Sequence, residues 1–366
     1  MTCDIWKNYL KYGWDASAGI GLLSFLPPFL SFPLLSNLHS TGMNAARKPE
    51  AVFRKPRRSP GVLDAYTMSN AKNQHWLPQL YLRAFRAPDA GDAVPRLWTF
   101  FRNGPEEPRL MSVEDIAAQR YLYSPGDATN RDHRVDVRLQ HLESMLGPLW
   151  PHLIDGFPPL DNEAVRKALA LFIATLYNRH PQRIDDLRAI HQQIVLALNK
   201  LPKDENGNPA ISHIEVNDHN REFDSSNWLS YVNARKIHFQ KSFAGNIVSN
   251  TGAIAEILLL KRWAVIVADE PVFATCDAPI VLANDKKARF GFASKRTNLY
   301  LPLSPKRFLI IEDPGLHNGY YSSKPGFPEA MNYQTWCAAD RYLLSATPSD
   351  EVLKGVMWFA GQHGLS

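Results

Sequence analysis

The chain has 366 residues, of which 45% are hydrophobic and 11% aromatic, so it can bury a substantial core. Its three cysteines, Cys3, Cys276 and Cys337, follow no metal-ligand spacing and fit a reducing compartment such as the cytoplasm. The formal net charge is +5, but residues 1–67 carry eight Lys and Arg against four acids, which leaves about +1 for the rest. The net charge of the body therefore supports no nucleic-acid partner.

Residues 1–67 differ in composition from the rest of the chain. The apolar stretch 16–35 contains three prolines, which a membrane-spanning helix rarely accommodates. A basic, proline-containing stretch follows at 47–60 and is typical of a linker or of disorder. We expect the natural start at Met68, with the upstream part either a disordered extension or the product of a mistaken start codon. The rival reading is a weak membrane anchor, whereas no membrane contact is expected for residues 68–366.

Three polar residues recur at intervals of four in the segment 73–85, namely His75, Gln79 and Arg83. Residues four apart share a helix face, so a helix here would align the three side chains. Pro78 is compatible with the first turn of such a helix. Three large apolar residues repeat at the same interval and would form a separate buried stripe: Leu77, Tyr81 and Phe85. The segment predicts one helix whose polar row faces the functional site.

The first half of the chain is mostly helical in its pattern. The aromatic, alternating run 96–101 predicts a strand, and Ser112 followed by acids predicts the start of a short helix. Apolar residues with helical periodicity predict five further helices, over 137–154, 162–180, 184–198, 228–243 and 247–260. Two prolines, 148 and 151, would bend or split the first of these, and Asp161 is the predicted cap of the second.

Two of these helices each place one charge on the face that the apolar residues occupy. Glu143 lies at the edge of the apolar stripe of the first helix, and Arg179 continues the stripe of the second. A charge on a buried face must be paired or functional. These two opposite charges are therefore candidates both for an ion pair and for a functional site.

The second half is richer in strands. Strand-like runs occur over five ranges: 263–268, 273–282 with a turn at Asp277, 299–303, 307–311 and 341–345. A closing helix is predicted over 350–359. Helices followed by strands predict an α+β fold, with residues 68–366 forming one interlocked domain.

The opening motif H-x-x-P-x-x-Y-L-R-x-F, from His75 to Phe85, resembles the start of an uncharacterised, mainly bacterial family named domain of unknown function 4238. Further blocks similar to the family follow in order over residues 70–346: Ile116-Ala-Ala leading to Tyr123, the helix with Glu143, Arg-His-Pro-Gln-Arg at 179–183, Phe-Ala-Thr-Cys-Asp-Ala-Pro at 273–279, Leu-Pro-Leu-Ser-Pro at 301–305, and Asn332 with Tyr342 and Ser345. Cys276 and Ala278 replace the small hydroxyl residue and the Asn usual in the family, which puts in doubt any role needing those groups. The resemblance supports Met68 as the start and implies no activity, because the family has no established one.

Six residues make up the candidate site: His75, Gln79, Arg83, Glu143, Arg179 and Asp277. An imidazole, two carboxylates, two guanidinium groups and an amide can together bind a divalent metal ion and a phosphate group. We therefore predict a metal-dependent hydrolase or nuclease that acts on a phosphate-containing substrate, with His75 as base or metal ligand. The two carboxylates would be metal ligands or the general acid and base, and the arginines and Gln79 would bind the substrate.

The same residues also have an architectural interpretation. Glu143 and Arg179 would be a buried ion pair, Arg83 would bridge to loop carbonyls, His75 would open a helix, and Asp277 would bond to the backbone of its turn. The protein would then be a non-catalytic binding or scaffold module. Exposed aromatic residues would supply its binding surface: Trp228, Tyr231, Tyr320, Tyr321 and Trp336. Stabilisation by Mn²⁺ or Mg²⁺ would favour the enzyme over the scaffold.

A nuclease variant would combine Asp277 with Asp285 and Lys287, because an acid followed by D-x-K can supply metal ligands and a lysine. That pattern is short and common by chance. The chain lacks a P-loop, a G-x-G-x-x-G after a strand, a G-x-S-x-G and an H-E-x-x-H. These absences argue against nucleotide-driven motors, dinucleotide oxidoreductases, classical esterases and zinc peptidases.

Overall fold

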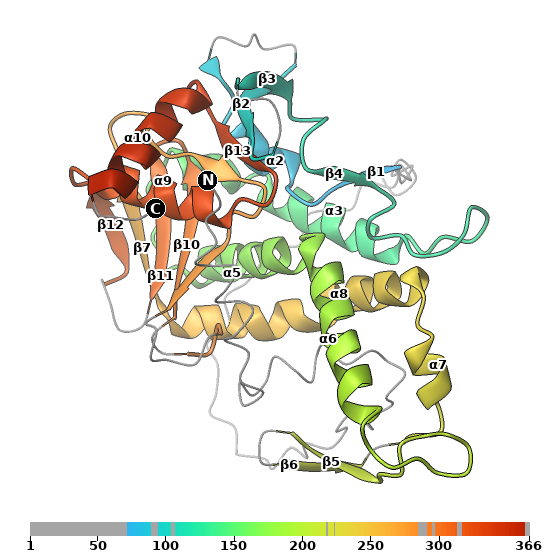
Figure 1. The fold of residues 1–366 in the computed structure, drawn as a ribbon. Helices are drawn as coiled ribbons and strands as arrows, with labels where there is room; N and C mark the ends of the chain where they lie inside the picture. The colour runs from blue at the N-terminus through green and yellow to red at the C-terminus, as the bar shows by residue number, and fades with distance from the viewer. Residues whose placement is uncertain are drawn as a thin grey trace, which may run out of the picture.

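A computed structural model describes the ranges 72–88, 94–103, 107–216, 219–222, 224–284, 291–294, 297–312 and 317–362. Within them the protein is α+β, as the sequence predicts. Short strands occur between residues 73 and 120, helices between 134 and 260, and most of the other strands between 262 and 345 (Figure 1). The predicted extension 1–67 lies outside the described residues, as do Asp285 and Lys287.

The larger sheet comes entirely from the second half of the chain. Its five strands follow the order β12 (Gly319–Ser322), β7 (Arg262–Val267), β11 (Arg307–Glu312), β10 (Thr297–Ser304) and β9 (Val281–Asn284). Neighbouring strands are antiparallel, except that β12 runs parallel to β7. The strands predicted around 263–268, 299–303 and 307–311 are confirmed, whereas β12 was not predicted.

The second sheet joins the two halves of the chain. Its four antiparallel strands follow the order β3 (Arg109–Ser112), β2 (Arg96–Phe101), β13 (Tyr342–Ser345) and β8 (Thr275–Cys276). The strands predicted at 96–101 and 341–345 are confirmed. The helix predicted from Ser112 is wrong, because β3 ends there in a turn in which Ser112 Oγ accepts the N–H of Glu114 (3.2 Å).

Six helices are described between β4 and β7 in the part of the chain that the structure covers: α3 (Arg134–Leu146), α4 (Trp150–Ile154), α5 (Glu163–Asn178), α6 (Gln182–Leu198), α7 (Trp228–Val232) and α8 (Lys236–Leu260). The break between α3 and α4 falls at the two prolines, as predicted. The cap of α5 is Asn162 rather than Asp161, because Asn162 Oδ1 accepts the N–H groups of Ala164 (3.0 Å) and Val165 (3.2 Å).

Helix α8 is continuous across 244–246, where the sequence predicted a break, and the predicted helix 228–243 is instead divided at 233–235, between α7 and α8. Phe243, Ala244 and Ile247 are buried at the predicted break, and α8 packs along α5 there, so tertiary packing keeps the segment helical. By length and composition alone α8 could cross a membrane.

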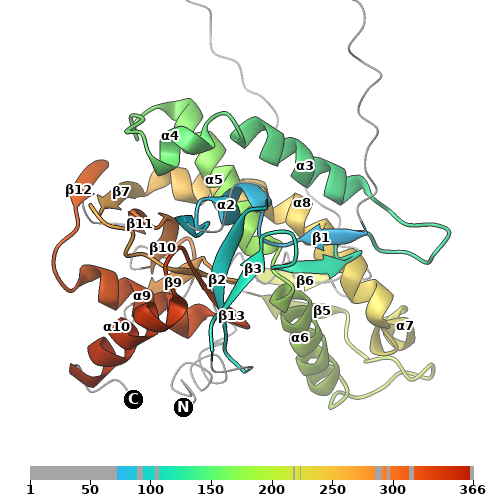
Figure 2. The ribbon, with the colours of Figure 1, turned by 90° about the horizontal axis from the view of Figure 1, so that it is seen from above.

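A hairpin of β5 (His213–Val216) and β6 (His219–Glu222) lies at the end of α6 that is far from the larger sheet (Figure 1). Helices α9 (Phe327–Ala338) and α10 (Ser349–Gln362) pack against each other at the opposite side (Figure 2).

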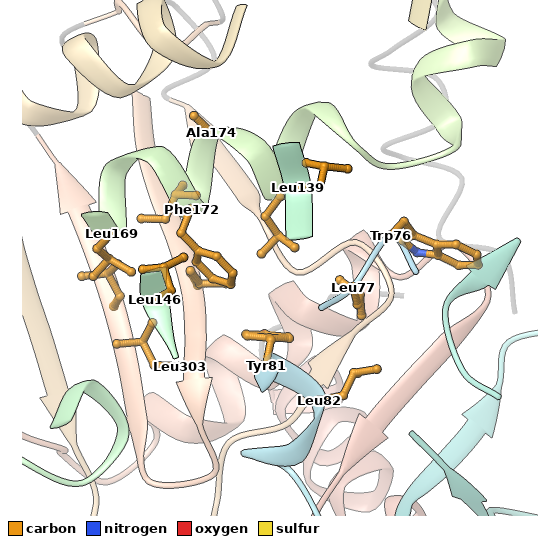
Figure 3. Close-up of a cluster of buried hydrophobic side chains, with 14 of the residues drawn as sticks. Trp76, Leu77, Tyr81, Leu82, Leu139, Leu146, Leu169, Phe172, Ala174 and Leu303 are labelled. Atoms are coloured by element: carbon orange, nitrogen blue, oxygen red, sulfur yellow. The ribbon is translucent and has the colours of Figure 1, made fainter. Parts of the chain in front are cut away.

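The opening motif lies inside the main core. Helix α2 (Gln79–Arg83) places Tyr81 and Leu82 among side chains of α3, α5 and β10 (Figure 3). The Tyr81 hydroxyl is satisfied by Thr275 Oγ1 (2.6 Å) and by the carbonyl oxygen of Pro302 (2.9 Å). Leu77, Tyr81 and Phe85 are all buried, as predicted, although only Tyr81 lies within α2. The buried cluster extends from Trp76 to Leu344 and so takes residues from both halves of the chain.

Candidate functional site

The segment 73–85 is divided between a strand and a helix, so the prediction of one continuous helix is wrong. Strand β1 (Asn73–His75) pairs with β4 (Ala118–Arg120), and α2 begins only after Pro78. The residue before a proline is disfavoured in the helical region, which prevents the helix from starting earlier. Gln79 and Arg83 do share a helix face, and Arg83 Nη2 donates to Gln79 Oε1 (3.1 Å) at the surface. His75 lies on β1, so it does not share that helix face.

Arg179, at the end of α5, is the centre of a first polar cluster. Its guanidinium donates from Nη1 to Glu143 Oε1 (2.8 Å), from Nη2 to the carbonyl oxygen of His75, and from Nε to the Tyr123 hydroxyl (3.4 Å). Tyr123 follows β4 and donates to the carbonyl oxygen of Arg179 (3.0 Å). All three guanidinium nitrogens are thus engaged, and they join β1, α3, α5 and the turn after β4. The ion pair that was the architectural alternative is present.

A further set of buried polar residues holds Tyr123 in place. Gln74 Oε1 accepts the N–H of Tyr123 (2.7 Å), while Gln74 Nε2 donates to Ser124 Oγ (2.7 Å). Ser124 Oγ lies 3.0 Å from His133 Nδ1. Nearby, Asp136 accepts from Gln140 Nε2 (3.0 Å), and burial raises the pKa of its carboxyl. Sequence reasoning did not identify this set; Tyr123 carried a signal only through its block of the family resemblance.

His75 and Glu143 bring the first cluster to the surface. The His75 ring is partly buried, and its Nε2 lies 3.1 Å from the carbonyl oxygen of Glu114. A carbonyl oxygen only accepts, so Nε2 carries the hydrogen and Nδ1 keeps its lone pair when the ring is neutral. Burial lowers the pKa of His75 below 6.5, and the cation of Arg179 adds to the shift. The Glu143 side chain is 27% exposed. A neutral imidazole therefore lies near an anchored carboxylate, which is a combination suited to general-base chemistry.

Asp277 is fully buried and belongs to a different group of contacts. Its Oδ1 accepts the N–H groups of Asp340 (3.0 Å) and Tyr342 (3.4 Å), and its Oδ2 accepts that of Arg341 (3.0 Å). Its carbonyl oxygen accepts from Trp76 Nε1 (3.1 Å). Burial raises the pKa of the Asp277 carboxyl to about 6, although the backbone hydrogen bonds oppose the shift. The predicted side-chain-to-backbone bonding occurs, but it reaches the segment before β13 rather than the turn of Asp277 itself.

Around Asp277 lies a second polar cluster, formed with His180 and Asp340. One ring nitrogen of His180 and one carboxylate oxygen of each aspartate all lie within 4.8 Å of one another. His180 is buried, and burial lowers the pKa of its imidazole to about 3, with Arg183 and Arg341 adding to the shift. His180 and Asp340 were not predicted. The position of His180 next to Arg179, inside the block 179–183, was the available signal.

The two clusters are neighbours, because consecutive residues of the chain contribute to different clusters. His75 and Arg179 contribute to the first cluster, whereas Trp76 and His180 contact each other beside the second, with ring centroids 6.1 Å apart. The structure therefore brings together His75, Glu143 and Arg179 from the predicted set. Asp277 lies in the neighbouring cluster. Gln79 and Arg83 form a hydrogen bond with each other at the surface.

The aromatic surface predicted for a scaffold is only partly exposed. Trp228 and Tyr231 are buried and stack on each other at 5.7 Å, so they are not available to a partner. Their burial follows from the packing of α7, where His191 lies 4.5 Å from the Tyr231 ring. The other three aromatic residues are half-buried: Tyr320, Tyr321 and Trp336.

Residues 73–352 match the family model described as protein of unknown function (DUF4238), which covers more than half of the chain. The chain belongs to this family. The match confirms the resemblance that the opening motif indicates, and it spans both polar clusters of this DUF4238 protein. Neither the search of the curated proteins nor that of the solved structures found a match.

Proposed function

We propose that this DUF4238 protein is a cytoplasmic hydrolase of phosphate-containing substrates, with His75 as its general base. One observation carries the proposal: His75 Nε2 donates to the carbonyl oxygen of Glu114, so the lone pair of the neutral ring is on Nδ1, and the charge of Glu143, which Arg179 anchors, favours the protonated ring. A base held in one tautomer by a third group recurs at hydrolytic sites. The lowered pKa keeps this imidazole neutral at neutral pH and able to accept a proton.

In this mechanism Nδ1 of His75 accepts a proton from water while the water oxygen forms a bond to phosphorus. The ester P–O bond breaks, and the leaving alcohol takes the proton back from the imidazolium. Glu143 stabilises the imidazolium, because its negative charge already favours the protonated form of His75. Every guanidinium nitrogen of Arg179 already donates within the fold and its side chain is only 4% exposed, so the exposed Arg83 remains the proposed phosphate-binding arginine.

Replacing His75 should remove the activity without unfolding the protein. We expect His75→Gln to lower the turnover of p-nitrophenyl phosphate or bis(p-nitrophenyl) phosphate by about 10²- to 10⁴-fold, the usual contribution of a positioned base. His141→Gln is the matched control, because His141 is exposed on α3 two residues before Glu143. Equal turnover by wild type and His75→Gln would contradict the proposal, and so would inactive wild-type protein on both esters with Mn²⁺ or Mg²⁺ present.

A non-catalytic scaffold is the second candidate, and one observation favours it. Arg179 and Asp277 are both buried, and their polar side-chain atoms already bond within the fold. In that case wild type hydrolyses neither ester, whether or not divalent ions are present. His75→Gln and Glu143→Gln then change stability alone, so the ester assay and the thermal scan together separate the two candidates.

A further inference from the structure

The second cluster lies outside the proposed hydrolytic site and gathers three metal-ligating groups from distant parts of the chain. His180 joins α5 to α6, Asp277 follows β8, and Asp340 precedes β13. Their candidate ligand atoms lie within 4.8 Å of one another. Two ligands on opposite sides of an ion with bonds of about 2.1 Å are about 4.2 Å apart. The three groups therefore span little more than the diameter of one coordinated ion.

His180 has a nitrogen that the protein leaves without a partner. Its side chain is 7% exposed, and its Nδ1 accepts the N–H of Gln182 (3.2 Å). Its Nε2 is buried and has no hydrogen-bond partner in the part of the chain that the structure describes. Burying a polar atom without a partner is unfavourable, and buried polar groups are normally satisfied. A cation between Nε2 and the two carboxylates would give all three groups a shared partner.

The two aspartates each retain capacity for a ligand. Asp277 Oδ1 accepts two backbone N–H groups, but Oδ2 accepts only that of Arg341, so one lone pair of Oδ2 is left. Among the described residues, the carboxylate of Asp340 has one long contact, from Oδ2 to Arg341 Nε (3.4 Å), and its side chain is 42% exposed. The cluster thus has two fixed, buried groups and one exposed group through which an ion and its water ligands can enter.

We propose that His180, Asp277 and Asp340 bind one divalent transition-metal ion, Mn²⁺ or Zn²⁺, with water completing the coordination. An imidazole with two carboxylates suits these ions, whereas Mg²⁺ and Ca²⁺ favour ligand sets made of oxygen alone. Binding through Nε2 moves the imidazole proton to Nδ1 and releases the Gln182 N–H from it. Gln182 is the first residue of α6, where an N–H lacks an intrahelical partner and can turn to water.

Metal binding by the full chain tests this site without any substrate. After removal of metal with EDTA, titration with MnCl₂ followed by electron paramagnetic resonance, and with ZnCl₂ by calorimetry, should show one saturable site per chain. Asp340→Asn removes the negative charge of an exposed ligand and should weaken binding at least about tenfold, a loss that even indirect partners of a metal can cause. Asp185→Asn is the matched control, because Asp185 is also half-exposed and paired with an arginine (Arg188, 2.6 Å). It should bind metal as wild type does.

Two results would overturn the site: no saturable binding of either ion, or an unchanged dissociation constant in Asp340→Asn. Because Asp340 is exposed, its variant should fold even where a variant of buried His180 does not. The metal site is independent of the proposed hydrolase activity, so either proposal can be contradicted without the other. His75→Gln should bind metal normally. Metal binding without ester turnover removes only the hydrolase, and turnover without saturable binding removes only the metal site.

Discussion

Glu143→Leu is expected to lower the free energy of unfolding by about 3–5 kcal/mol, because it leaves the buried charge of Arg179 without its counterion. The Arg179 side chain is only 4% exposed, so water cannot replace the lost carboxylate. Nη1 loses its partner at 2.8 Å, while the bonds of the other two nitrogens to His75 and Tyr123 remain. Urea denaturation followed by circular dichroism measures the change.

Two companion variants identify the cause of this loss. Glu143→Gln keeps an oxygen acceptor for Nη1 and should lose less stability. The double variant Glu143→Leu/Arg179→Met removes both charges and should recover much of the loss, since apolar replacement of a buried pair is often close to neutral. If Glu143→Leu instead stays within about 1 kcal/mol of wild type, the pair behaves like an exposed one, and the buried role of Arg179 is contradicted.

Asp277→Ala should have an effect of similar size for a different reason. Three backbone N–H groups before and in β13, those of Asp340, Arg341 and Tyr342, lose their acceptor together. Each buried donor left unsatisfied costs about 1–3 kcal/mol, so we expect a total loss of about 3 kcal/mol or more. The measurement is chemical denaturation with EDTA present, so that metal does not contribute.

Asp277→Asn keeps one oxygen of the two and should lie between wild type and the alanine variant. The control is Asp185→Ala, whose aspartate is exposed and should change stability by no more than about 0.5 kcal/mol. A loss from Asp277→Ala no larger than that of Asp185→Ala would show that the backbone before β13 does not depend on this carboxylate.

Local patterns predicted the elements that depend on local chemistry. The alternating run of β2, the burial of Leu77, Tyr81 and Phe85, and the proline break between α3 and α4 all follow from side-chain periodicity or from proline geometry. The predictions that were wrong concern elements whose structure depends on tertiary contacts. Strand β1 forms because it pairs with β4, which is distant in sequence: Asn73 lies opposite Arg120 and His75 opposite Ala118. Helix α8 stays continuous because its midpoint is buried against α5.

The candidate site was predictable to the same degree. Opposite charges on two buried helix faces indicated that Glu143 and Arg179 meet, and they do. The partner that fixes His75 is the carbonyl oxygen of Glu114, a backbone atom that no side-chain pattern reveals. His180, Asp277 and Asp340 follow α5, β8 and α9, and they meet because the C-terminal ends of these three elements converge. The spacing of the residues in the sequence does not indicate that convergence.

The proposed function depends most directly on the protonation state of the His75 ring. A long-range ¹H–¹⁵N spectrum of the histidine rings, with His75 assigned from His75→Gln, reports both the tautomer and the pKa of that ring. We predict a neutral ring at pH 7 with its hydrogen on Nε2, and a pKa below 6.5. A ring that is doubly protonated at pH 7 has no lone pair to accept a proton, and a ring with its hydrogen on Nδ1 has its lone pair on Nε2, which faces the Glu114 carbonyl oxygen. Either result would contradict His75 as the general base.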